Sequence, residues 1–273
     1  MTDNSSGVAG ERPKIDSSVA HSARVWDYWL GGKDNYAADR EAGDQIRLVL
    51  SDVVEAARVD RAFLIRAVRY LVAEAGIRQF LDIGTGLPTA NNTHEVAQSV
   101  APDCRIVYVD NDPIVLAHAR ALLVGSTLGA TDYIDADVHD PDAILRAAAR
   151  TLDFSQPIAI MMLGVMQFVM DDEAAQTIVK RLVDAVPSGS YLAIAHPISG
   201  VSAPLDEAVR LWNATGSAPQ TLRAPDLVAR FFDGLELLDP GVVPCPQWRP
   251  DPHEADADRD VAPWRVSALG RKP

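Results

Sequence analysis

Apolar residues change their spacing near residue 77, and this change divides the chain into two parts. Before it, they recur three and four positions apart, which is the spacing of amphipathic helices. Three helices are expected there: a short one ended by Gly31-Gly32, a second capped by Asp34 and running towards residue 50, and a third over about 60–74. The first third of the chain is therefore predicted to be helical.

After residue 77, short apolar runs alternate with helical patterns, which is typical of a parallel sheet covered on both faces. Five runs are predicted as strands, over about 79–83, 105–109, 133–134, 158–163 and 191–195. Two last runs, 235–238 and 264–269, have no helical pattern between them and should pair antiparallel at one edge. The predicted fold class is α/β, with a mostly parallel, seven-stranded Rossmann-like sheet, an antiparallel terminal pair and a helical N-terminal extension.

The same patterns predict how the chain is organised. Residues 1–18 are polar and punctuated by Gly, Ser and Pro, which predicts a flexible tail. Residues 19–76 are assigned to the helical N-terminal segment. Residues 77–273 are assigned to a single ligand-binding domain.

Composition narrows the class of protein. The chain has 273 residues, of which 48% are hydrophobic, and its 38 acidic and 25 basic residues give a formal charge of −13. This charge argues against a nucleic-acid substrate. Cys104 and Cys245 offer neither a disulfide framework nor metal-ligand spacing, and the histidines show no HxxxH or HxH pattern. With no apolar run of membrane-spanning length and no signal-peptide core, we expect a cytoplasmic protein that binds no membrane and no metal.

The stretch QFLDIGTGLPTANNTHEVA, residues 79–97, carries the main candidate site. An apolar strand breaks at Gly84-Thr85-Gly86 and a helical pattern follows, as in turns that hold nucleotides at the end of a strand. The third glycine of the dinucleotide pattern GxGxxG is absent, and Asp82 lies in the strand end. A carboxylate there would repel a pyrophosphate and attract an ammonium group. S-adenosylmethionine (SAM) carries such a group and is the predicted cofactor.

Further candidates follow the other strands, because ligands bind at the carboxyl ends of an open parallel sheet. Asp110 can accept hydrogen bonds from both ribose hydroxyls, and Asp137 can accept one from an adenine amino group. The alternative for each is helix capping, for which Asp112 and Asp140 are better placed.

The ends of the fourth and fifth strands supply weaker candidates. Gly164 ends the fourth strand, and Met166, which lies beyond it, could flank a ligand. Met161 and Met162 are better explained as core residues. His196, after the fifth strand, is the best single candidate for a general base, although a structural histidine remains the stronger interpretation.

Several segments together resemble a bacterial family of SAM-dependent methyltransferases long classed as a domain of unknown function. They are ARVWDYWLGGKDNYAADR, FLDIGTGLPTANNTHEVAQ, VYVDNDPIVLAHARALL, ADVHDP and the closing GRKP. The resemblance covers the chain from about Ser18 to Pro273, and residues 23–40 are its most distinctive part. It implies the class I methyltransferase form of the Rossmann-like sheet with an added helical N-terminus. The family supplies no methyl acceptor.

By this resemblance, Asp82, Gly84 and Gly86 belong to the methionine-binding turn, Asp110 is the ribose acid, and Asp137 and Val138 border the adenine. Their neighbours Thr85 and Asn111 are also predicted to bind the cofactor. The chain departs from the family after the fourth strand, where Gln167 replaces a histidine of the family's AVLHF pattern. Any mechanism that relies on that histidine is in doubt here.

The segment over residues 23–40 is predicted to act as a lid over the methionine end of SAM. Tyr28, Gly32 and Lys33 are expected nearest to the ligand, because a backbone without Cβ can approach it and an ammonium can meet its carboxylate. The alternative is a helix that only packs against the core.

The sequence thus predicts a SAM-dependent methyltransferase that acts on a small-molecule acceptor. A non-catalytic module that binds SAM or S-adenosylhomocysteine (SAH) remains an alternative, and a nicotinamide-dependent oxidoreductase is a weaker one. The oligomeric state, the acceptor and the use of a general base stay open.

Overall fold

The computed structural model describes residues 16–88, 90–115, 126–215, 218–250 and 261–273. Most of the predicted N-terminal tail, residues 1–15, lies outside this part of the chain. The apolar pattern also predicts a helix from Pro113 to about Leu123, and most of it lies outside the described residues as well.

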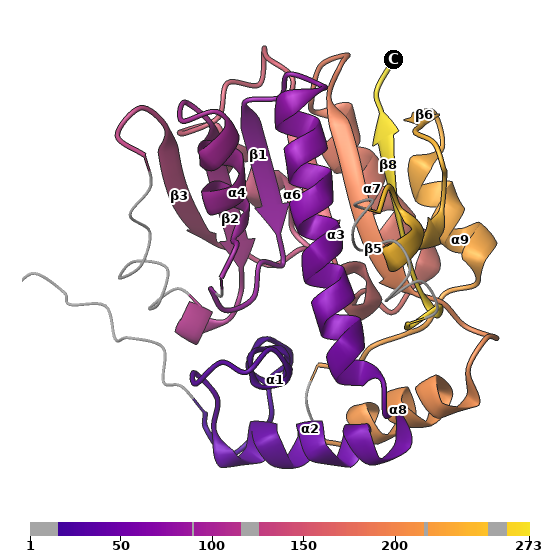
Figure 1. Cartoon of the computed structure of the whole chain (residues 1–273). Helices are drawn as coiled ribbons and strands as arrows, with labels where there is room; N and C mark the ends of the chain where they lie inside the picture. The colour runs from indigo at the N-terminus through magenta and orange to yellow at the C-terminus, as the bar shows by residue number, and fades with distance from the viewer. Residues whose placement is uncertain (1–15, 89, 116–125, 216–217, 251–260) are drawn as a thin grey trace, which may run out of the picture.

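An eight-stranded sheet forms the centre of the molecule, in the order β3-β2-β1-β4-β5-β8-β6, with β7 paired to β8 (Figure 1). The strands are β1 Gln79–Ile83, β2 Arg105–Asp110, β3 Ala130–Asp135, β4 Ala159–Leu163, β5 Tyr191–Pro197, β6 Glu236–Leu237, β7 Val243–Pro244 and β8 Arg265–Arg271. Strands β1 to β5 are parallel, and β8 runs antiparallel to β5, β6 and β7. The predicted sheet is confirmed. The added strand β7 has only two residues, too few to show a pattern in the sequence.

Helices cover both faces of the sheet. The helices of the described residues are α1 Ser22–Trp29, α2 Ala37–Val49, α3 Val53–Ala73, α4 Thr93–Val100, α6 Pro141–Ala148, α7 Asp172–Asp184, α8 Ala203–Asn213 and α9 Pro225–Ala229. The 3₁₀ turns are η1 Met166–Phe168, η2 Arg230–Phe232 and η3 Cys245–Gln247. The buried side chains of α3 and α4 form one hydrophobic cluster with the sheet, and those of α6, α7 and α9 form another. The sheet is therefore buried on both sides, as its continuous apolar strands require.

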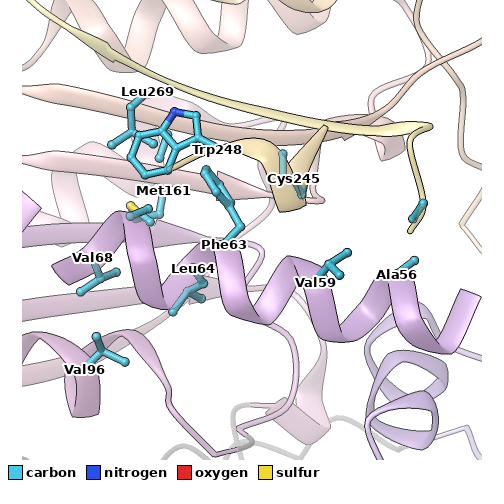
Figure 2. Close-up of a cluster of buried hydrophobic side chains, with 14 of the residues drawn as sticks. Ala56, Val59, Phe63, Leu64, Val68, Val96, Met161, Cys245, Trp248 and Leu269 are labelled. Atoms are coloured by element: carbon cyan, nitrogen blue, oxygen red, sulfur yellow. The ribbon is translucent and has the colours of Figure 1, made fainter. Parts of the chain in front are cut away.

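Helix α3 is the longest element and packs along one face of the sheet (Figure 2). Phe63 meets the ring of Trp248 edge to face, with 5.4 Å between the ring centres. The helix begins at Val53, seven residues before the predicted start, because Ala56 and Val59 extend its buried face by almost two turns. After its end, Ile77 donates a backbone hydrogen bond to the carbonyl of Leu71, so the chain turns directly into β1.

The N-terminal helices α1 and α2 lie across the carboxyl ends of the strands, beside α8 (Figure 1). Asp34 was expected to cap α2, but it does not. The cap is at Tyr36, whose backbone N–H donates to Asp39 Oδ2 over 2.8 Å. The other oxygen of this buried carboxylate accepts from the backbone N–H of His21 and from Arg24 Nε. Asp39 therefore fixes α1 against α2.

Candidate functional site

A cavity of about 310 Å³ opens at the carboxyl ends of β1 to β4 and is closed on one side by α1. A volume of this order is typical of small-molecule sites. Nine of the residues predicted to bind the cofactor line it: Asp82, Gly84, Thr85, Gly86, Asp110, Asn111, Asp137, Val138 and Gly164. The cavity lies where the strand order reverses about β1, which is the usual ligand position in an open α/β sheet.

The glycine turn after β1 is held by its neighbours. Gly84 has φ +76°, and its N–H donates to the carbonyl of Val109 over 2.8 Å. A Cβ at Gly84 would come within 2.5 Å of the Val165 side chain, so the loop after β4 also requires glycine here. Gly86 has φ +64°, and among the described residues only Ala23 of α1 lies within 4 Å of an added Cβ. The turn thus leaves room between itself and α1.

Asp82 lies at the end of β1 and is buried. One carboxylate oxygen accepts a 2.6 Å hydrogen bond from the hydroxyl of Thr93, at the start of α4. Burial raises its pKa to about 6, although Thr93 and the nearby Arg61 guanidinium act in the opposite direction. A cation bound beside Asp82 would favour its charged form.

Asp110 joins the turn to β2. Its Oδ2 accepts from the Gly86 N–H over 2.8 Å, and its Oδ1 accepts from the Asp112 N–H over 3.0 Å. Burial raises its pKa more than these bonds lower it. Each carboxylate oxygen has two lone pairs, so Asp110 can still accept from a ligand hydroxyl.

Asp137 organises the loop after β3. It accepts from the backbone and the ring of His139, at 2.9 and 2.6 Å, and from Asn111 Nδ2 at 3.2 Å. Burial raises its pKa, but these bonds outweigh burial and leave it lowered. The capping role belongs to Asp140, which accepts from the Ala143 N–H, so the carboxylate of Asp137 is not needed for the helix.

Tyrosines form one wall of the cavity. Tyr108 and Tyr133 stack with ring centres 6.4 Å apart, and the Tyr133 hydroxyl lies 3.2 Å from Thr85 Oγ1. The backbone N–H of His94 donates to the Tyr108 hydroxyl, which also lies 2.8 Å from His94 Nδ1. This wall stands between the turn and β3, where a flat ligand ring can pack.

Among the described lining residues, carboxylates outnumber guanidinium groups by five to two. The acids are Asp27, Asp60, Asp82, Asp110 and Asp137, and the bases are Arg61 and Arg265. SAM carries a sulfonium, an ammonium and one carboxylate. A net acidic cavity with two separate cations fits such a ligand.

Four predicted cofactor-binding residues are not among the described residues that line the cavity. Met166 is fully buried in the core behind β4. The Tyr28 hydroxyl donates to Asp44, Lys33 is exposed, and Gly32 packs against the Asp27 side chain. The residues predicted to lie nearest to the ligand in the lid are therefore corrected. A different face of α1, carrying Ala23, Trp26 and Asp27, borders the cavity.

His196 lies within β5, not after it, because that strand extends to Pro197. Its Nε2 lies 2.9 Å from Arg223 Nη1, its Nδ1 lies 2.7 Å from the Pro197 carbonyl, and its side chain is buried. Burial lowers its pKa to about 3. The structure supports the structural interpretation of this histidine and not that of a general base.

Sequence reasoning missed Arg61, Gln167 and Arg265 as components of the site, although Gln167 had been noted as a departure from the family pattern. Arg61 lies within the pattern of a long helix and Arg265 opens the last strand of the chain, so neither carries a local motif. Trp26 lies in the distinctive N-terminal stretch, which did signal a role.

Comparison with known proteins identifies the family. The family model described as "S-adenosyl methyltransferase" matches residues 8–273. The chain belongs to this S-adenosyl methyltransferase family. Its methyl donor is therefore SAM, and the oxidoreductase alternative is set aside.

Solved structures agree with the family. A DUF574 family protein from Streptomyces avermitilis is 45% identical, with a TM-score of 0.91 over 95% of this chain and 100% of that chain. A protein from Thermobifida fusca, provisionally named a methyltransferase, is 39% identical, with a TM-score of 0.85 over 97% and 99%. An O-methyltransferase family protein from Burkholderia thailandensis shares only the fold, at 15% identity and a TM-score of 0.52 over 80% and 59%. A search of the curated proteins found no match.

The other expectations concern membranes and metals. Within the described ranges, no helix is both long and apolar enough to cross a membrane. The same ranges contain no group of three or more His, Cys, Asp or Glu side chains arranged to hold a metal ion.

Proposed function

We propose that this methyltransferase transfers the methyl group of SAM to a small-molecule acceptor inside the cavity. SAM supplies an electrophilic methyl group on its sulfonium. The observation that carries the proposal is the cavity itself, which helix α1 covers at the strand ends. A covered cavity suits a small acceptor better than a polymer, and the charge of −13 disfavours nucleic acid.

The adenosine half of SAM is assigned to the ends of β2 and β3. Asp110 accepts hydrogen bonds from the ribose hydroxyls, and Asp137 with Val138 borders the adenine. The tyrosine wall offers a flat surface on the same side.

The methionine half is assigned to the end of β1. Asp82 receives the ammonium, and Arg61 on α3 receives the carboxylate. Within the described residues Arg61 has no hydrogen-bond partner, and burial lowers its pKa although Asp82, Tyr108 and Asp60 oppose this effect. A carboxylate ligand would supply the missing partner of a largely desolvated cation.

Little acid–base chemistry is assigned to the protein. Transfer to a good nucleophile can depend on positioning alone. The buried, partnered His196 supplies no base at the cavity.

The test uses SAM with a tritiated methyl group and a cell extract divided by ultrafiltration into small molecules and macromolecules. Label is expected in a product of the small-molecule fraction. Label in protein or nucleic acid instead would refute the proposed acceptor class. The Asp82→Ala variant should form far less product under the same conditions.

A further inference from the structure

One end of the cavity lies away from the residues assigned to SAM. It is bordered by Trp26 of α1, by Gly164 and Gln167 after β4, and by Arg265 at the start of β8. Apart from Arg61 on α3, the assigned cofactor residues follow β1, β2 and β3, whereas Gly164 and Gln167 follow β4, on the other side of β1. A second molecule bound at this end would lie beside the cofactor.

Arg265 is a buried cation with a fixed orientation. Its side chain is 3% exposed, and its Nε donates to Asp60 Oδ2. Asp60 is held in turn by Cys245, whose Sγ donates to Oδ1 over 3.4 Å. The guanidinium lies over the Trp26 ring, 5.3 Å from its centre. Asp60 and Trp26 thus act as positioning residues for Arg265.

The two Nη groups of Arg265 donate to no acceptor in the described part of the chain, since the one hydrogen bond of the side chain there uses Nε. A Cβ added at Gly164 would overlap Nη2. Glycine at this position therefore keeps the Nη2 edge of Arg265 clear of a side chain. Buried donors without partners are unfavourable, and a ligand oxygen would satisfy them.

Gln167 offers a second buried polar group without a partner. Its backbone carbonyl accepts from the Thr221 N–H over 2.8 Å, which fixes the turn η1. Its side-chain Oε1 is buried and has no hydrogen-bond partner among the described residues. This oxygen would lie 3.8 Å from a Cβ at Gly164, on the same glycine that faces Arg265 Nη2. Donor and acceptor thus converge on one small space.

We propose that Arg265 and Gln167 form the recognition site for the methyl acceptor, and that the acceptor carries a carboxylate together with a hydroxyl or amino group. The carboxylate binds the Nη atoms of Arg265, and the hydroxyl or amino group donates to Gln167 Oε1. Trp26 and Phe168 supply aromatic walls for the body of the acceptor. This inference rests on the proposed function, because it needs SAM in the adjoining half of the cavity.

The charge at this site favours an anion over a cation. The carboxylate of Asp60 already meets Arg265 through Nε and has its other oxygen bound to Cys245. Asp27 also lines the cavity, but its Oδ2 accepts from the Asp34 N–H and from Asn35 Nδ2. The Nη groups of Arg265 are the charged donors at this end that no described residue satisfies. Two parallel N–H groups match the geometry of a carboxylate.

The test measures binding of three probes to the full chain saturated with SAH, by ligand-observed NMR titration. The probe 3-hydroxybenzoate has both features, 3-hydroxybenzamide lacks the charge, and benzoate lacks the donor. We expect 3-hydroxybenzoate to bind roughly ten-fold or more tightly than 3-hydroxybenzamide, and benzoate to bind more weakly than 3-hydroxybenzoate. Equal affinity for 3-hydroxybenzoate and 3-hydroxybenzamide would overturn the proposal.

Gln167→Glu places a negative charge beside Arg265 without removing the partner of Asp60. It should weaken 3-hydroxybenzoate binding roughly ten-fold or more and leave the affinity for SAH within about two-fold. Gln156→Glu adds the same charge at an exposed position and should change neither affinity.

Arg265→Lys keeps a cation near Asp60 but loses the pair of Nη donors. It should also weaken the binding of 3-hydroxybenzoate. A melting temperature close to that of the unaltered protein would show that this variant is folded. An equal loss of SAH affinity in Gln167→Glu would overturn the proposal, because it would place Gln167 in the cofactor site. Failure of the unaltered protein to bind SAH would instead contradict the assigned cofactor site.

Discussion

Asp82 is the residue whose charge depends most on what binds beside it. Burial at the end of β1 raises its pKa to about 6, from a usual value of 3.8. Without ligand, folding therefore favours the protonated acid. The free energy of unfolding should fall as the pH rises from about 4 to about 6, since the carboxylate that forms is buried.

Binding of SAM should show the opposite dependence. The ammonium of SAM interacts favourably only with the charged carboxylate, so affinity should fall as the pH drops below about 6, approaching ten-fold per pH unit. Binding near pH 6 should also release protons from Asp82. Calorimetry between pH 5 and 7.5, in two buffers of different ionisation enthalpy, measures both effects. Asp82→Asn should bind SAM weakly with a flat profile, and an unchanged slope in this variant would assign the titration to another group.

Asp110 links the glycine turn to β2 and also faces the cavity. Asp110→Ala removes a charged acceptor, a change that typically costs about 1.5–3 kcal/mol, so SAM affinity should drop about ten-fold or more. The melting temperature without ligand should also fall, because the Gly86 N–H loses its partner. Calorimetry and thermal unfolding measure the two effects. Intact SAM affinity with a lower melting temperature would show that Asp110 is purely structural.

At the scale of elements, α1 is the part of the molecule that completes the cavity. The side chain of Arg24, on α1, donates to three acceptors: Asp39 Oδ1 and the backbone carbonyls of Asp16 and Val19. At its start, His21 Nδ1 lies 2.9 Å from Asp112 Oδ2, in the turn after β2. The helix is thus tied both to α2 and to the sheet, and its inner face is fixed relative to the glycine turn.

Gly32, after α1, has a packing role that its neighbour Lys33 does not share. A Cβ at Gly32 would overlap the carboxylate of Asp27, which lines the cavity. Gly32→Ala should displace Asp27 and weaken SAM binding about five-fold or more, whereas Lys33→Ala should stay within about two-fold. Titration calorimetry on both variants makes the comparison. A larger effect from Lys33→Ala would restore the original lid prediction.

At the scale of the whole molecule, α3 connects the core to the site. Phe63 and Leu64 are buried on the helix, while Asp60 and Arg61 reach the cavity one turn away. The loop that contains Trp248 closes over the same helix (Figure 2). Arg66 donates to the Trp248 carbonyl over 3.0 Å. Stability of this core and placement of Arg61 are therefore coupled.

Truncating the core contact should test how much α3 contributes to the core. Phe63 is fully buried, so Phe63→Ala should lower the free energy of unfolding by about 3–5 kcal/mol. Leu48, which is 86% exposed on α2, provides the control, and Leu48→Ala should change stability by no more than about 0.5 kcal/mol. Chemical denaturation measures both. Similar values for the two variants would mean that α3 does not carry the core.

The sequence by itself determined the sheet and one half of the site. The strands are visible because each is a continuous apolar run, and the glycine turn and the acids at Asp82, Asp110 and Asp137 follow strand ends directly in the chain. Each of these features is defined by its place directly after a strand in the chain. Because parallel strands end at the same edge of the sheet, the features are brought together there. The start of α3 was missed because its first turns combine buried alanines with polar residues.

Only the tertiary structure decided which residues complete the cavity. Arg265 meets Asp60 across 205 positions of the chain, and the inner face of α1 is chosen by contacts to Asp39 and Asp112. The same packing buries His196 against Arg223 and turns Lys33 towards solvent. Such contacts join segments far apart in the sequence, and their partners are set by how helices pack on the sheet. No spacing or motif within a single segment contains that information.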